Sequence, residues 1–180
     1  MQRTRILVPL SFSTPSDYAL LEARLLSGQM NGMLTCLHVI EEPSYLKSHT
    51  SREIGKKIRR EAEIRLSENV NRIIPGSDNI VFEIIVTAGI PYRKILEKAA
   101  ELNPGLIVMG RADEVDSGNQ RLGSNTLGVL TGSTIPVLIT PVDSSGAQMS
   151  LHRSLDLNGI QKQVRQTSPP RDYFGRTMIS

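Results

Sequence analysis

The chain has 180 residues and a mass of 19.9 kDa, with 39% apolar and 22% charged residues, which indicates one globular domain with some chain left over and excludes wholesale disorder. Its net charge is only +3 and its aromatic residues are three Phe and four Tyr, so the clustered charge and stacking aromatics of nucleic-acid-binding proteins are missing. No apolar run reaches the length of a membrane-spanning helix, the amino-terminal residues show no secretory signal, and the single Cys36 forms no internal disulfide. We therefore expect a cytoplasmic protein without membrane insertion and without nucleic acid as a partner.

Strand-like and helix-like segments alternate along the first 142 residues. In chain order, the pattern predicts strands at residues 5–10, 34–40, 80–86, 106–109 and 136–140, separated by helices that start near residues 13, 51, 91 and 123. The strand-like runs are short and rich in Val and Ile, and their nearly continuous apolar character is typical of strands covered on both faces. We predict an α/β fold, with an open five-stranded parallel sheet that is doubly wound and carries helices on both faces.

The predicted helices carry start signals and apolar stripes. Ser13, Thr14 and Ser16 supply capping hydroxyls around Pro15, which suits the first turn of a helix. Through residues 51–74, apolar side chains recur at intervals of three and four, as expected for an amphipathic helix. These side chains belong to Ile54, Ile58, Ala62, Leu66, Val70 and Ile73.

The alternation of strands and helices stops after Val142. Residues 143–146 have the composition of a linker, and residues 167–180 contain few apolar side chains. Between them, apolar residues recur at helical spacing but are interrupted by Asn158 and Gly159. We predict a domain over residues 1–142 and a mostly flexible tail over residues 143–180, with a short helix near 151–165.

Ligands of doubly wound sheets bind beyond the carboxyl ends of the strands, near the point where the strand order reverses. This rule selects the loops at residues 9–13, 39–50, 87–91 and 110–125. In the last of these, Gly110 follows a buried strand, and Gly123 and Ser124 open the next helix. Glycines let the backbone approach a phosphate, and the N–H groups and dipole of a helix start attract negative charge. The loop is consistent with an anion-binding site and also with ordinary turn chemistry.

A series of short motifs, in order and at the right spacing, resembles the universal stress protein family over residues 4–141. The motifs are ILVPLSFS at residues 6–13, LHV at 37–39, Gly-Ile-Pro at 89–91, LIVMG at 106–110, Gly-Ser at 123–124 and PVLIT at 136–140. The resemblance implies a parallel five-stranded fold. For many members it also implies ATP binding through a loop that reads Gly, two residues, Gly, nine residues, Gly-Ser or Gly-Thr. The site residues that follow from it are Pro9, Leu10, Ser11, Val39, Met109, Gly110, Asp113, Gly123, Ser124, Asn125 and Thr126.

The first departure from the family's pattern is at the end of the first strand. Ser11 stands where family members typically have an Asp that holds the adenosine, whereas Gly110, Gly123 and Ser124 match the pattern of the loop. A neutral hydroxyl forms a weaker hydrogen bond than a carboxylate does. We expect the change to weaken nucleotide binding by about 1 kcal/mol and not to abolish it.

The second departure is Asp113, which stands at the second glycine of the loop. With Glu114 and Asp116 it brings three carboxylates to the place where a triphosphate would lie, and their charges repel phosphate. Arg111 and Arg121 could offset this charge, or a Mg²⁺ ion could bridge Asp113 to the phosphates, since Mg²⁺ prefers carboxylate and phosphate oxygens. The other interpretation is a solvated acidic loop that has lost its ligand.

From the resemblance we predict a regulator that binds ATP, either alone or together with a phosphate-bound Mg²⁺ ion, and acts in stress-response signalling. The alternative is a nucleotide-free, dimeric protein-interaction module of the same family. The retained glycines favour the first interpretation, and the two departures favour the second. The resemblance also implies a homodimer through the last strand, which begins with Pro136 and ends with Thr140. The identity of any further protein partner stays unknown.

The sequence contains no catalytic constellation. Ser11 and Ser13 have no His and acid at a readable spacing, and there is no phosphate loop of the Gly-Lys-Ser or Gly-Lys-Thr type. We expect at most slow ATP hydrolysis or autophosphorylation, for which Ser124 or Thr126 would be the nearest acceptors. The three histidines show no spacing typical of a metal site.

Overall fold

The computed structural model describes residues 3–41, 52–75, 80–111, 113–116 and 119–140. The tail predicted for residues 143–180 lies outside the described residues, and the domain boundary at Val142 stays a prediction. The elements are β1 (Thr4–Pro9), α1 (Thr14–Gln29), β2 (Gly32–Ile40), α2 (Arg52–Ile73), β3 (Phe82–Ala88), α3 (Pro91–Leu102), β4 (Leu106–Gly110), β5 (Asp113–Asp116), β6 (Asn119–Leu122), α4 (Ser124–Gly132) and β7 (Val137–Thr140).

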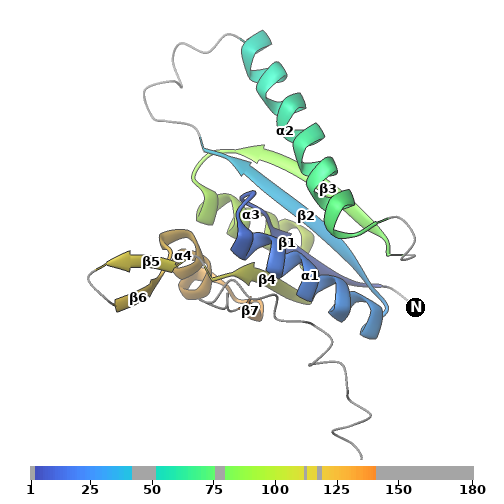
Figure 1. Ribbon diagram of the computed structural model, residues 1–180, viewed down its shortest axis with the longest axis vertical. Coiled ribbons are helices and arrows are strands. Elements are labelled where there is room, and N and C mark those ends of the chain that lie inside the picture. The colour runs from blue at the N-terminus through green and yellow to red at the C-terminus, as the bar shows by residue number, and fades with distance from the viewer. Residues whose placement is uncertain (1–2, 42–51, 76–79, 112, 117–118, 141–180) are drawn as a thin grey trace, which may run out of the picture. The chain divides into compact units, whose positions relative to one another are not determined.

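Five strands form one parallel sheet in the order β3-β2-β1-β4-β7 (Figure 1). The chain adds β2 and β3 on one side of β1 and then adds β4 and β7 on the other side. In this register Ile6 of β1 lies opposite Leu34 of β2 and Leu106 of β4. The predicted five-stranded, doubly wound α/β fold is confirmed, and the strand order reverses between β1 and β4.

Helices cover both faces of the sheet. On one face, Leu20 of α1 and Val70 of α2 pack in a cluster with Ile6 of β1. On the other face, Ile95 of α3 packs in a cluster with Leu7 of β1. Neighbouring residues of a strand point to opposite faces, and both Ile6 and Leu7 are fully buried. Residues 6–8 of β1 form a continuous apolar run, as expected for a strand that is covered on both faces.

α1 begins at the capping residues that the sequence predicts. Ser13 is the N-cap, and its Oγ accepts a hydrogen bond from the Ser16 N–H at 3.5 Å, while the Ser13 N–H donates to the Ser16 Oγ at 3.1 Å. This reciprocal arrangement is a capping box with Ser in place of the usual Glu or Gln. Pro15 occupies the first turn, where its missing N–H has no cost. The cap fixes the start of α1 close to the carboxyl end of β1.

α2 packs on the sheet mainly through its second half. Leu66 and Val70 are fully buried, whereas Ile54 and Ile58, at the start of the same apolar stripe, are 53% and 42% exposed. Figure 1 shows the first turns of α2 extending past the ends of β2 and β3. Within the described ranges, no helix combines the length and the apolar character that a membrane crossing requires.

α4 lies close against α3 because two of its glycines face larger side chains. A Cβ atom at Gly128 would lie 2.7 Å from Cγ of Tyr92, and one at Gly132 would lie 2.6 Å from Cδ1 of Leu96. Real Cβ atoms do not approach other carbon atoms so closely, so a larger residue at either position would push the helices apart. This close packing sets the position of the amino end of α4 at the edge of the sheet.

Between β4 and α4 two short strands pair where the sequence pattern predicts a loop. β5 and β6 pair antiparallel, with Asp113 opposite Leu122 and Glu114 opposite Arg121. Asp, Glu and Asn are unfavourable in strands, and the segment has no alternating apolar pattern, so the sequence carries no strand signal here. A two-stranded hairpin is marginal by itself. Its two ends are brought together by β4 and α4, which is information that only the tertiary structure contains.

Candidate functional site

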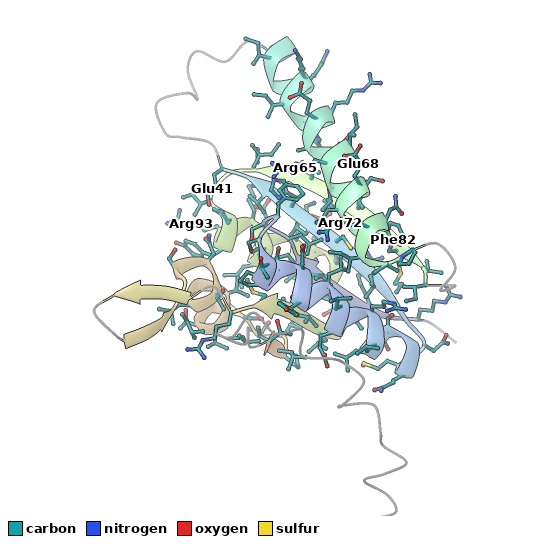
Figure 2. The ribbon with its side chains drawn as sticks, in the orientation of Figure 1. Glu41, Arg65, Glu68, Arg72, Phe82 and Arg93 are labelled. Carbon is teal, nitrogen blue, oxygen red and sulfur yellow. The ribbon has the colours of Figure 1, made fainter. Side chains whose placement is uncertain are left out.

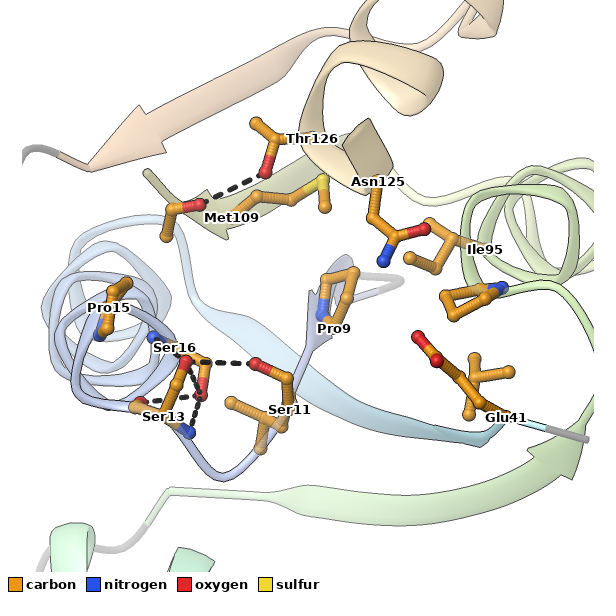
Figure 3. A pocket seen from close by; sticks show the side chains of 14 residues that line it. Pro9, Ser11, Ser13, Pro15, Ser16, Glu41, Ile95, Met109, Asn125 and Thr126 are labelled. Atoms are coloured by element: carbon orange, nitrogen blue, oxygen red, sulfur yellow. Dashed lines mark hydrogen bonds between the residues drawn. The ribbon is translucent and has the colours of Figure 1, made fainter. Parts of the chain in front are cut away.

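A pocket of about 140 Å³ opens at the carboxyl ends of β1 and β4, where the strand order reverses (Figure 3). The end of β2 and the first residues of α1, α3 and α4 complete its walls. The residues that line it are Pro9, Leu10, Ser11, Ser13, Pro15, Ser16, Val39, Glu41, Pro91, Ile95, Met109, Gly110, Asn125 and Thr126. This is the place at which doubly wound sheets bind ligands.

Most of the residues predicted for the site line this pocket. They are Pro9, Leu10, Ser11, Val39, Met109, Gly110, Asn125 and Thr126. The other three do not: Gly123 is the N-cap of α4, Ser124 is its exposed first residue, and Asp113 opens β5. Their predicted role as ligands stays a prediction.

Six lining residues were not predicted from the sequence. They are Ser13, Pro15, Ser16, Glu41, Pro91 and Ile95. The rule that ligands bind at strand ends had already selected the loops that contain Ser13, Glu41 and Pro91, so this signal could have found them. Ile95 lies one turn inside α3, and its place in the pocket depends on how that helix crosses the sheet.

The hydroxyl groups of the loop between β1 and α1 bond with one another. The Oγ atoms of Ser11 and Ser13 are 2.9 Å apart, and the Ser16 hydroxyl donates to the Ser13 carbonyl oxygen at 2.8 Å. Figure 3 shows this chain of contacts along one wall of the pocket. Ser11, which stands where the family pattern has an acidic residue, therefore already has a partner within its own loop.

The side chain of Phe12, in the same loop, contacts the side chains of His38 and Arg65. Phe12 has a positive φ of 59°, a conformation that costs a residue with a Cβ about 1 kcal/mol. The centre of the Phe12 ring lies 4.3 Å from the centre of the His38 ring in β2. The guanidinium carbon of Arg65 in α2 lies 4.2 Å from the centre of the same Phe12 ring. Figure 2 shows Arg65 and Arg72 on the side of α2 that faces the sheet.

His38 also contacts the backbone of this loop. Its Nδ1 lies 2.8 Å from the carbonyl oxygen of Leu10, and because a carbonyl can only accept, Nδ1 carries the proton. The Leu10 N–H donates in turn to the carbonyl oxygen of Leu37 at 2.8 Å. Both hydrogen bonds extend the link between β1 and β2 beyond the sheet, so the loop that carries Ser11 is held by β2.

Gly110 has a packing role at the end of β4. A Cβ atom there would collide with the carbonyl group of Pro15 and would lie 2.8 Å from its Cβ. The carbonyl oxygen of Gly110 accepts a hydrogen bond from the Thr126 hydroxyl at 3.3 Å. The first glycine of the predicted phosphate loop is thus required for the contact between β4 and α1, whether or not a ligand is bound.

The sequence profile of the Universal stress protein family matches residues 2–141. The chain belongs to this family. The resemblance seen in its motifs is confirmed over nearly the same residues, and it ends where the predicted tail begins.

Solved structures show the same fold as this universal stress protein. The hypothetical protein MJ0577 is 25% identical, with a TM-score of 0.66 over 79% of this chain and 98% of that one. A universal stress protein in complex with cAMP is 20% identical, with a TM-score of 0.53 over 78% and 98% of the two chains. The universal stress protein from Archaeoglobus fulgidus in complex with dAMP is 17% identical, with a TM-score of 0.55 over 77% and 98%. A search of curated proteins found no match.

This universal stress protein also presents the amino end of α4 to the pocket. The first helical hydrogen bond runs from the Leu127 N–H to the Gly123 carbonyl oxygen at 2.9 Å. The N–H groups of the preceding residues therefore have no partner within the helix, and Asn125 and Thr126 line the pocket. This helix end can hold a negatively charged group.

The lining that the structure describes contains one ionisable side chain, the carboxylate of Glu41. Within the described residues, His, Cys, Asp and Glu form no group of three or more that could hold a metal ion. Chemically, the pocket thus offers apolar walls, small hydroxyls, one amide, one carboxylate and a helix end.

Proposed function

We propose that this universal stress protein binds an adenine nucleotide in the pocket between β1 and β4 and acts as a cytoplasmic regulator in stress-response signalling. The observation that carries the proposal is the pocket itself. It lies at the switch point of the sheet and is lined by residues of the family's adenosine-binding strands, Pro9, Leu10, Ser11 and Val39. Relatives of the same fold that are described with cAMP and dAMP support the same ligand class.

The walls of the pocket fit the two ends of a nucleotide. Pro9, Val39 and Ile95 give an apolar surface on which a base can lie. The amino end of α4, with Asn125 and Thr126 in the lining, suits a phosphate. If the ligand is ATP, as the loop pattern predicts, Asp113 at the start of β5 is the residue through which a Mg²⁺ ion would join the outer phosphates.

Calorimetry of the purified chain with ATP, with and without Mg²⁺, and with AMP tests this function directly. Binding of at least one nucleotide with a stoichiometry near one per chain supports it. Mass spectrometry under native conditions adds a second readout, because a co-purified nucleotide would appear as an added mass. The absence of heat with every nucleotide at millimolar concentration would exclude nucleotide binding.

A second candidate function is a dimeric protein-interaction module, and one observation favours it. β7 is an edge strand of the sheet, and Leu138 in it is 36% exposed. Leu127 and Leu130, three residues apart on one side of α4, are 48% and 42% exposed. Exposed apolar edges of this kind are usually covered in a stable protein, and a second copy pairing along residues 136–140 would cover this one.

Light scattering measures the dimer, whose mass should be about twice 19.9 kDa. Leu138→Arg should shift the protein toward the monomer, whereas Ile64→Arg, on an exposed position of α2, should not. A wild-type monomer at high concentration would contradict pairing through β7. Dimerisation without any bound nucleotide would favour the second function over the first.

A further inference from the structure

The pocket carries its one described ionisable group at the end of β2. Glu41 is the residue directly after β2, and it is exposed. Figure 3 shows its carboxylate turned from the strand end toward the middle of the pocket. The family's pattern has its acidic partner of the adenosine at position 11, directly after the end of β1, where this chain has Ser11. In this chain a carboxylate enters the pocket from the neighbouring strand.

The two positions differ in what they can offer a ligand. Ser11 has a neutral hydroxyl that is already 2.9 Å from the Ser13 hydroxyl. Glu41 has two carboxylate oxygens, which accept hydrogen bonds and make stronger ones than a neutral group does. The groups of an adenosine compound that can donate to a carboxylate are the ribose hydroxyls and the adenine amino group. A phosphate, by contrast, is repelled by the same charge.

The number of backbone N–H groups that could bind phosphates is limited as well. In the stretch between Gly110 and Gly123, which would wrap a polyphosphate, residues 113–116 and 119–122 pair with one another as β5 and β6. In an antiparallel pair, about half of the N–H groups point to the partner strand and are used there. The amino end of α4 remains, and the donors of a single helix end suit one phosphate group.

We propose that this pocket selects adenosine compounds with no more than one phosphate over ATP, and that Glu41 is the residue that determines this specificity. The Glu41 carboxylate accepts hydrogen bonds from the nucleoside part of the ligand and disfavours additional phosphates. The inference rests on the proposed nucleotide-binding function and names the ligand class for the same site.

Calorimetric titration of the full chain with adenosine, AMP and ATP, each with and without Mg²⁺, tests the selectivity. AMP is expected to bind about tenfold more tightly than ATP at low ionic strength, and the difference should shrink as salt screens the charges. ATP binding as tightly as AMP or more tightly would overturn the selectivity and leave nucleotide binding in place. No binding of any of the three compounds would overturn the proposed function itself and the selectivity with it.

Glu41→Gln removes the charge at nearly constant size, and the exposed position makes a folding defect unexpected. It should weaken adenosine binding several-fold and tighten ATP binding, so that the ratio of the two dissociation constants changes by about tenfold. Glu68→Gln, on the exposed surface of α2, is the matched control and should leave the ratio unchanged. An equal effect of Glu41→Gln on all three ligands, or no effect on any, would contradict the role of Glu41.

Discussion

Gly110, the last residue of β4, lies so close to Pro15, in the first turn of α1, that no side chain fits between them. The contact joins two segments 95 positions apart in the chain at the wall of the pocket, and a Cβ at Gly110 would collide with the Pro15 carbonyl group. A glycine that the family's loop pattern assigns to phosphate binding therefore has a separate structural requirement.

We expect Gly110→Ala to lower the free energy of unfolding by about 1–3 kcal/mol, because the new methyl group must displace the backbone of α1. Urea denaturation measures this loss. Gly28→Ala is the control, since a Cβ at Gly28 in α1 meets nothing within 4 Å and alanine is the better helix former. Equal stability of Gly110→Ala and the wild type would contradict the close contact.

Gly123→Asp should separate ligand binding from folding. The new carboxylate would cap α4 and occupy the N–H groups that a ligand phosphate needs, while its charge repels that phosphate. We expect AMP affinity to fall at least about tenfold, with thermal stability unchanged or slightly higher. Gly123→Asn, which caps without the charge, should retain more of the affinity. Unchanged AMP binding in Gly123→Asp would place the phosphate elsewhere.

His38 should contribute to stability through its ring contact with Phe12 and through the hydrogen bond from its Nδ1 to the Leu10 carbonyl oxygen. His38→Phe keeps a ring beside Phe12 but loses the hydrogen bond to the Leu10 carbonyl oxygen, which we expect to cost about 1 kcal/mol. His38→Ala loses both contacts and should be less stable still. AMP affinity should fall in the same order, because the loop that carries Ser11 is less well held. The prediction is wrong if His38→Phe matches the wild type in both measurements.

Cys36 should make the protein's stability depend on pH in the alkaline range. Burial, and secondarily the charge of Glu83, raise the pKa of the Cys36 thiol from its ordinary value of 9.0 to about 12. The folded protein keeps this proton where the unfolded chain releases it, so the contribution is complete below pH 9 and is lost as the pH rises toward 12. Between pH 9 and 10, the wild type should lose about 1 kcal/mol more than Cys36→Ala does. Parallel stability curves for the two proteins would contradict this prediction.

Deleting residues 143–180 should leave the melting temperature nearly unchanged, because the family match ends at residue 141. Differential scanning calorimetry of the full and shortened chains measures the difference. A loss of several degrees would mean that the segment 151–165 packs on the domain.

The sequence predicts the main sheet and its helices well, because each signal is local. Leu7 and Ile107 belong to apolar runs that only a strand covered on both faces can bury. The start of α1 at Ser13 is likewise visible in the capping residues themselves. The β5–β6 hairpin is not visible, since Asp113 and Glu114 are poor strand formers and their pairing depends on the positions of β4 and α4.

The strand-end rule and the motifs together predicted residues at the ends of β1, β2 and β4 that line the pocket, but they did not single out Glu41. Ser11 is visible as a departure from a pattern, but the pattern says nothing of Glu41, which reaches the pocket only because β1 and β2 are neighbours. The sequence by itself determined the five strands of the main sheet, the helices, the family and the approximate place of the pocket, because local periodicity and short motifs carry that information. Only the tertiary structure decided that Gly110 is needed by Pro15 and that the pocket's described charge comes from Glu41, because both depend on which distant segments the sheet brings side by side.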